Sequence, residues 1–112
     1  MLDVQKALNA AGIPGFRVSL RMGEMQEIPP VFVAWALQNA PGMFMDDAPT
    51  AMLHEVQMHL VSINDPMAPW AALQRCMVDE GFSFVEMQES YDEEADVYVL
   101  VSRWKGVELY EI

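Results

Sequence analysis

The densest group of residues that could do chemistry is a cluster of four acids, Asp92, Glu93, Glu94 and Asp96. Asp92, Glu94 and Asp96 occupy alternate positions, as do the first carboxylate ligands of a calcium loop of the EF-hand type. The match then fails, because Val97 stands where the sharp turn needs glycine and Arg103 stands where the bidentate glutamate belongs. No helical pattern flanks the cluster. We therefore interpret it as the solvated turn of a β-hairpin, whose charges discourage aggregation through a sheet edge.

The other candidates for chemistry are His54, His59 and Cys76. Two strand residues five apart point to opposite faces, so the two histidines are not expected to share a metal ion. Cys76 lies in a predicted helix and is interpreted as a small core residue, although a Cys–His nucleophilic pair stays open. The sequence has no glycine-rich phosphate-binding loop, no Cys or His pairs at the spacing of zinc ligands, and no nucleophile elbow around a serine. We therefore predict no catalytic residues, no metal ligands, no cofactor and no enzymatic activity.

The composition is both acidic and apolar. Seventeen Asp and Glu against six Lys and Arg give a formal net charge of −11 over 112 residues, of which 53% are hydrophobic. The charge excludes a typical nucleic-acid binder, because phosphates require a basic surface, and the apolar content excludes disorder. The length suits a single domain over residues 1–112. The single cysteine and the lack of a signal peptide or long apolar run predict a cytoplasmic origin and no membrane contact.

Ten methionines are many for so short a chain. Methionine fills gaps in cores and also adapts to surfaces that meet other chains, so both interpretations stay open. Residues 40–50 are predicted to form a loop, because they include two prolines, a glycine and two aspartates. A free loop gains nothing from exposing three large apolar side chains, so we expect a contact with another subunit or a partner. Folding back over the protein's own sheet is the alternative. The candidate interface residues are Met43, Phe44, Met45, Asp46 and Asp47.

Two helices are predicted to flank the central part of the chain. Residues 2–11 carry apolar side chains at helical spacing, Asp3 can cap the first turn, and Gly12 supplies the stop. The second helix is predicted to begin after Asp65–Pro66 and to end at Gly81. Its inward-facing stripe consists of Trp70, Leu73 and Met77.

Five short strands complete the predicted domain. Residues 16–20 could form a brief strand, and residues 31–37 are apolar on both faces, which suits a strand covered on both sides. Residues 51–63 alternate with period two and are interpreted as a strand, with a helix as the alternative. Residues 82–91 and 96–109 flank the acidic turn as a hairpin. The order α-β-β-β-α-β-β predicts an α+β domain, in which two helices pack on a small, mostly antiparallel sheet.

Several short motifs occur in a fixed order along the chain: prolines before a strand, "DD" in the following segment, "NDP" before a helix and the closing hairpin "YDEEADVYVLVSRWK". This order resembles the small tail-completion, or tail-terminator, proteins of long-tailed bacteriophages. In many of these proteins a similar Asp-Pro opens the helix, and a hairpin of the form "YDEET..Y....RF" closes the chain. The stretch "VFVAWALQ" and the methionine-rich segment depart from that pattern and leave a head–tail connector relative open. The matching residues are Asp65–Pro66, Tyr91, Asp92, Glu93, Glu94, Tyr98 and Arg103–Trp104.

The resemblance implies a structural protein of the virion tail that is made in the host cytoplasm. Such a protein assembles as a ring, expected to be a hexamer, on the last ring of the tail tube. There it stops polymerisation, with the tail tube protein and the head connector protein as its partners. An acidic ring lumen would let DNA slide past, because like charges repel. The alternative is a small acidic binding or inhibitor module of the DNA-mimicking kind, acting as a monomer or dimer.

Overall fold

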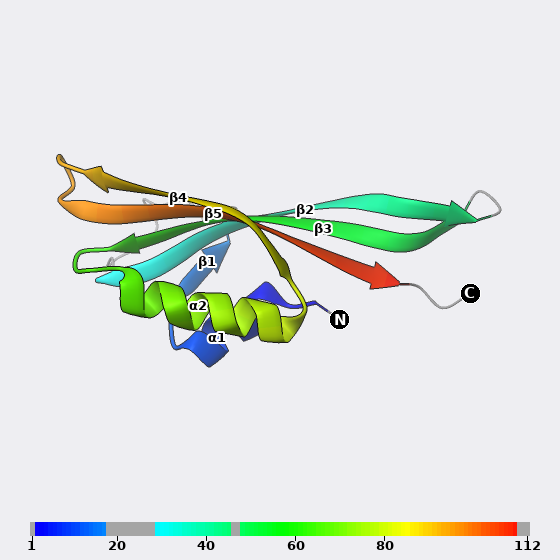
Figure 1. Ribbon diagram of the computed structural model, residues 1–112, viewed down its shortest axis with the longest axis horizontal. Coiled ribbons are helices and arrows are strands. Elements are labelled where there is room, and N and C mark those ends of the chain that lie inside the picture. The colour runs from blue at the N-terminus through cyan, green and yellow to red at the C-terminus, as the bar shows by residue number, and fades with distance from the viewer. Residues whose placement is uncertain (1, 18–28, 46–47, 110–112) are drawn as a thin grey trace.

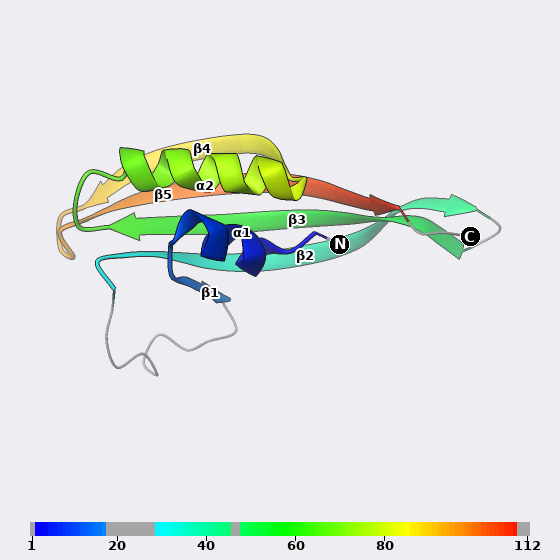
Figure 2. The ribbon, with the colours of Figure 1, turned by 90° about the horizontal axis from the view of Figure 1, so that it is seen from below.

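Seven elements build the protein, with both helices on one face of a five-stranded sheet (Figures 1 and 2). The computed structural model describes residues 2–17, 29–45 and 48–109. The order confirms the predicted α-β-β-β-α-β-β arrangement and the α+β class. The elements are α1 (Val4–Ala11), β1 (Gly15–Arg17), β2 (Val31–Met45), β3 (Ala48–Ser62), α2 (Met67–Glu80), β4 (Ser83–Asp92) and β5 (Val97–Leu109).

The strands lie in the order β1-β2-β3-β5-β4. The short β1 pairs with β2 in parallel, and the other three pairs are antiparallel. Helix α2 connects β3 to the edge strand β4, and the chain then returns through a tight turn as β5 between them. The start of β2, the end of β3 and the β4–β5 turn therefore lie at the same end of the sheet.

Both helices begin and end as their sequences predict. The Asp3 carboxylate accepts a hydrogen bond from the Lys6 backbone N–H at 3.1 Å. The Asp65 carboxylate accepts a hydrogen bond from the Met67 backbone N–H at 3.0 Å. Asp65 lies one residue before Pro66, which is the N-cap of α2. Gly12 and Gly81 end the helices at φ angles of 73° and 111°, where a side chain would be strained. The predicted cap Asp3 and the two glycine stops are confirmed, whereas Pro66, not Asp65, occupies the N-cap position of α2, and the side chain of Asp65 binds from one residue earlier.

The alternation along β3 separates the core from the opposite face of the sheet. Val56, Met58 and Leu60 are buried toward the helices, whereas Gln57 and His59 are exposed on the other face. This period of two confirms the predicted strand, and the helical alternative for residues 51–63 is wrong. We call the face without helices the open face.

The core between the sheet and the helices is built around Trp104, which is 1% exposed. Its ring lies 6.1 Å from that of Trp70 on α2 and 5.3 Å from that of Phe84 on β4. Its indole N–H donates to the hydroxyl of the buried Ser102 at 3.0 Å. Because an unpaired buried N–H is costly, this bond lets a tryptophan occupy the centre of the core. The predicted inward stripe of α2 is also confirmed, since Trp70, Leu73 and Met77 are all buried.

Strand β2 corrects two predictions. The helices cover only one of its faces, and on the open face Phe32 is buried but Ala36 is exposed, so coverage on both sides is limited to the start of the strand. The predicted loop over residues 40–50 is also wrong, because β2 continues to Met45 and β3 begins at Ala48, and the two strands pair with each other. Shifts in register next to Met43 accommodate the prolines of this hairpin, since bulges and edges tolerate a missing N–H. Residues 18–20 of the predicted first strand lie outside the described residues.

The β2–β3 hairpin extends well beyond the helices (Figures 1 and 2). We call its outer part, residues 38–45 of β2 and 48–53 of β3, the arm. The end of β5 pairs with the arm only as far as Ala51, opposite Leu109, so the last residues form a two-stranded ribbon. The molecule is correspondingly elongated, with extents of 53 × 28 × 22 Å.

Candidate interaction surfaces

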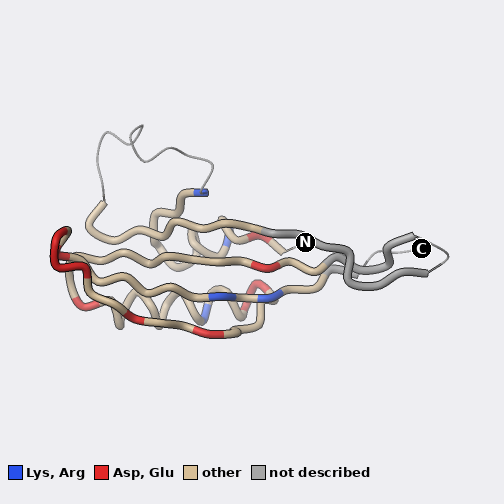
Figure 3. Tube along the Cα trace, turned by 90° about the horizontal axis from the view of Figure 1, so that it is seen from above, with Lys and Arg blue, Asp and Glu red and all other residues tan. Residues whose placement is uncertain are grey.

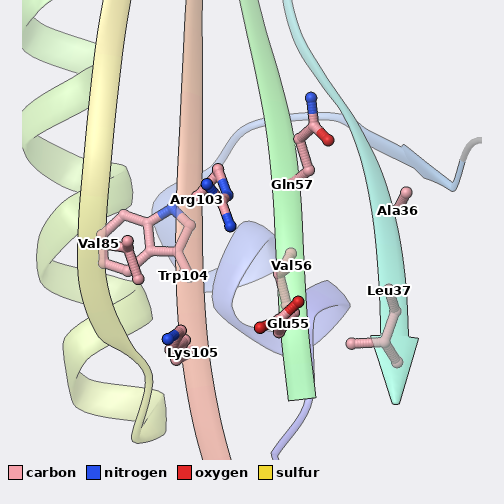
Figure 4. Close-up of a pocket in the computed structure, with 9 residues that line it drawn as sticks. All are labelled: Ala36, Leu37, Glu55, Val56, Gln57, Val85, Arg103, Trp104 and Lys105. Atoms are coloured by element: carbon pink, nitrogen blue, oxygen red, sulfur yellow. The ribbon is translucent and has the colours of Figure 1, made fainter. Parts of the chain in front are cut away.

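The middle of the open face holds a shallow polar hollow of about 370 Å³ (Figure 4). Neighbouring side chains of β3 and β5 supply its charges, and β2 and β4 supply apolar walls. The described lining residues include no histidine, cysteine, serine or threonine, so they supply no hydroxyl or thiol nucleophile and no imidazole base. They are Ala36, Leu37, Glu55, Val56, Gln57, Val85, Arg103, Trp104 and Lys105.

The charges around this hollow balance. The Arg103 guanidinium lies 3.0 Å from the Glu86 carboxylate, and both side chains are at least half exposed, so the pair adds little stability. Lys105 stands opposite Glu55 across β3 and β5, although no ion pair within 4.0 Å joins Lys105 to any described residue. Two cations and two anions leave no net charge to attract a highly charged ligand.

The four acids singled out by the sequence lie at the end of the β4–β5 hairpin, as predicted for a turn. One carboxylate oxygen of Asp92 accepts hydrogen bonds from the N–H groups of Glu94 and Ala95, at 3.0 and 3.1 Å. The Tyr91 hydroxyl donates to Asp96, whose φ of 58° lies in the left-handed region that aspartate tolerates. Two of the four acids therefore hold the turn, while the carboxylates of Glu93 and Glu94 make no hydrogen bond within the described residues.

An apolar hollow of about 480 Å³ lies beside this turn, and we call it the cup. Phe32 is buried in it and packs edge-to-face with Phe16, with 6.1 Å between the ring centroids. At the rim, Ile63 is 54% exposed. Sequence reasoning missed the cup because its residues come from three separate segments whose register sequence alone does not fix. They are Pro29, Pro30, Phe32, Val61, Ile63, Ala95 and Val97.

The candidate interface residues Met43, Phe44 and Met45 lie on β2 in the arm, at the end of the sheet opposite the acidic turn. Asp46 and Asp47 lie outside the described residues. The structure therefore does not bring the two groups of candidate residues together. It places them at the two ends of an elongated molecule.

The residues considered for catalysis are separated. His54 falls on the helix-facing side of β3 and His59 on the open face, while Cys76 is half-buried on α2. Cys76 packs against the core without being fully buried, which is less burial than predicted. Among the described residues, no group of three or more His, Cys, Asp or Glu side chains is placed to hold a metal ion.

Neither described helix is long and apolar enough to cross a membrane.

Comparison with known proteins gives no assignment. No model of a known protein family matches the chain, and no curated protein sequence matches it.

Proposed function

We propose that this chain is a structural protein of a bacteriophage tail that forms a ring, caps the tail tube and joins it to the head connector. The order of short sequence motifs suggests that family. The observation that supports assembly is the arm, a pair of strands that leaves the helix-covered body and extends along the long axis of the molecule (Figure 1).

The physical argument concerns what stabilises such an arm. A two-stranded ribbon is marginally stable in water unless a third strand or another layer packs on it. The outermost residues of the arm, Phe44 and Met45 against Pro49 and Ala48, have no third strand beside them among the described residues. A neighbouring subunit or the tail tube would supply that layer. The sequence of the arm suits such a contact, because it is rich in methionine and other apolar residues.

The two ends of the molecule differ, so the arm of one subunit could meet a different surface of its neighbour, as a ring requires. The arm leaves one end of the sheet, while the acidic turn and the cup occupy the other. Contacts between unlike surfaces are heterologous, and they close into a ring when the rotation between subunits allows it. The formal charge of −11 per subunit would keep DNA from adhering to such a ring as it passes.

The experiment combines microscopy of the purified protein with deletion of its gene. Negative-stain images should show rings with a central hole, and a deletion in the genome that encodes the protein should give tails of irregular length without attached heads. Compact particles with no hole, together with normal tails after deletion, would refute the proposal. They would favour the small acidic binding module instead.

A further inference from the structure

The cup and the acidic turn form one continuous surface. Ala95 belongs to both, because it lines the cup and lies in the turn between Glu94 and Asp96. Val97, the first residue of β5, continues the apolar lining from the turn into the sheet. On the far side, the Ile63 N–H donates to the Pro30 carbonyl at 3.0 Å, which fixes the end of β3 against the start of β2. Backbone hydrogen bonding therefore joins the two strands that supply this side of the surface.

Among the described residues, the charged side chains at this end of the molecule are acidic (Figure 3). The β4–β5 turn contributes four carboxylates, and Asp65 adds a fifth where the chain leaves β3 for α2. The described cations lie elsewhere, on α1, at the end of β1, along α2 and in the middle of β5. They are Lys6, Arg17, Arg75, Arg103 and Lys105.

We propose that this end of the protein docks a segment of a partner protein in which one or two large apolar side chains are flanked by Lys or Arg. The cup, at about 480 Å³, falls within the range of binding pockets, roughly 300–1,000 Å³, and its lining is apolar. The side chain of Ile63 would be covered on binding. Glu93 and Glu94 are available to pair with the flanking cations, because their carboxylates hold no part of the turn.

The charge decides between classes of partner. Nucleic acids and anionic membrane surfaces are repelled by an acidic rim. A second copy of this chain is a poor match, because Trp104, the apolar residue between its neighbouring cations Arg103 and Lys105, is buried in its own core, and Arg103 is already paired with Glu86. A basic segment is steered toward the rim, and its apolar side chains then enter the cup. This inference goes beyond the proposed ring and does not depend on it.

The test is an NMR titration of the full, isotope-labelled chain with a capped peptide of Leu-Phe-Leu between two lysines. Saturable shifts are expected at the backbone amides of Phe32, Val61 and Ile63, which surround the cup. A matched peptide with glutamates in place of the lysines should bind at least about tenfold more weakly, and added salt should reduce that difference. The absence of saturable binding below about 1 mM, or equal binding of both peptides, overturns the proposal.

Matched variants separate the cup from the rest of the surface. Ile63→Ser should weaken binding of the lysine peptide about fivefold or more, while Val78→Ser, an equally exposed residue on α2 (56% against 54%), should not change it. Glu93→Lys combined with Glu94→Lys should remove most of the preference for the lysine peptide, because two cations would then face the three remaining acids, whereas Asp79→Lys on α2 should leave the preference unchanged. Shifts centred elsewhere, or contacts showing the cup filled by a second copy or by another segment of the same chain, contradict the proposal.

Discussion

The acidic cluster divides into residues that hold the turn and residues that do not. Asp92 accepts two backbone hydrogen bonds, and Asp96 accepts one from the Tyr91 hydroxyl. The carboxylates of Glu93 and Glu94 make neither a hydrogen bond nor an ion pair within the described residues. Their contribution to folding should therefore be small, and their charge remains available to a partner.

Replacing Glu93 and Glu94 together with Ser should leave the free energy of unfolding within about 0.5 kcal/mol of the original, because exposed side chains without partners contribute little. Asp92→Ala should lower it by about 1 kcal/mol or more, because the turn loses two hydrogen bonds. Chemical denaturation measures both effects. Calorimetric titration should detect no calcium binding before or after the change, and micromolar binding would show that the cluster is a metal loop.

A second prediction concerns Trp70, which is 6% exposed and packs against Trp104. Trp70→Ala should lower the free energy of unfolding by about 3–5 kcal/mol, because it leaves a cavity between α2 and the sheet. Val78→Ala on the exposed side of the same helix is the control and should change it by about 0.5 kcal/mol or less. An unchanged midpoint for Trp70→Ala would mean that α2 does not pack on the sheet through this side chain.

Local chemistry made these individual residues predictable. A carboxylate before a helix, a glycine after it and an apolar stripe at helical spacing are patterns within one element, and they identified Asp3, Gly12 and Trp70 correctly. The bond between Trp104 and Ser102 and the composition of the cup depend on how separate strands align. That alignment is a property of the folded sheet, which periodicity along one segment does not reveal.

Among the elements, the arm shows how turn-forming residues can mislead. Pro41, Gly42 and Pro49 suggested a loop, yet the hairpin continues past them with shifted register. Proline is excluded from a strand only where its N–H would be needed, and at an edge or a bulge it is not. Met43, Phe44 and Met45 therefore lie on the outer part of a strand and not in a loop. That they contact another chain remains a prediction.

Phe44→Ser tests that role. If Phe44 contacts another subunit or the tail tube, the monomer of the variant should melt within about 2 °C of the monomer of the original protein, but ring formation should be weakened, because only the assembly loses apolar contact. Val78→Ser, on the exposed side of α2 and outside the arm, should affect neither property. A fall of about 1 kcal/mol or more in the stability of the isolated chain would indicate that Phe44 packs within its own subunit. Normal melting together with normal rings would remove the arm from the interface.

The whole molecule is an elongated sheet whose two ends have different surfaces. The arm extends from one end, and the acidic turn with its apolar cup closes the other (Figures 1 and 3). The α+β class and the order of elements were predictable, because each helix and most strands carry a clear period. The length of the arm was not, because its prolines, glycine and aspartates are typical of a loop, and the pairing of its two strands is not visible in the periodicity of one segment.

The mass of the assembled particle tests the central claim most directly. Native mass spectrometry of the purified chain, over a range of concentrations, should give one dominant species at about six times the 12.7 kDa subunit mass, because a closed ring has a fixed number of subunits. Phe44→Ser should reduce that species in favour of monomer. A monomer or dimer at every concentration, or a ladder of sizes with no preferred number of subunits, would contradict the ring.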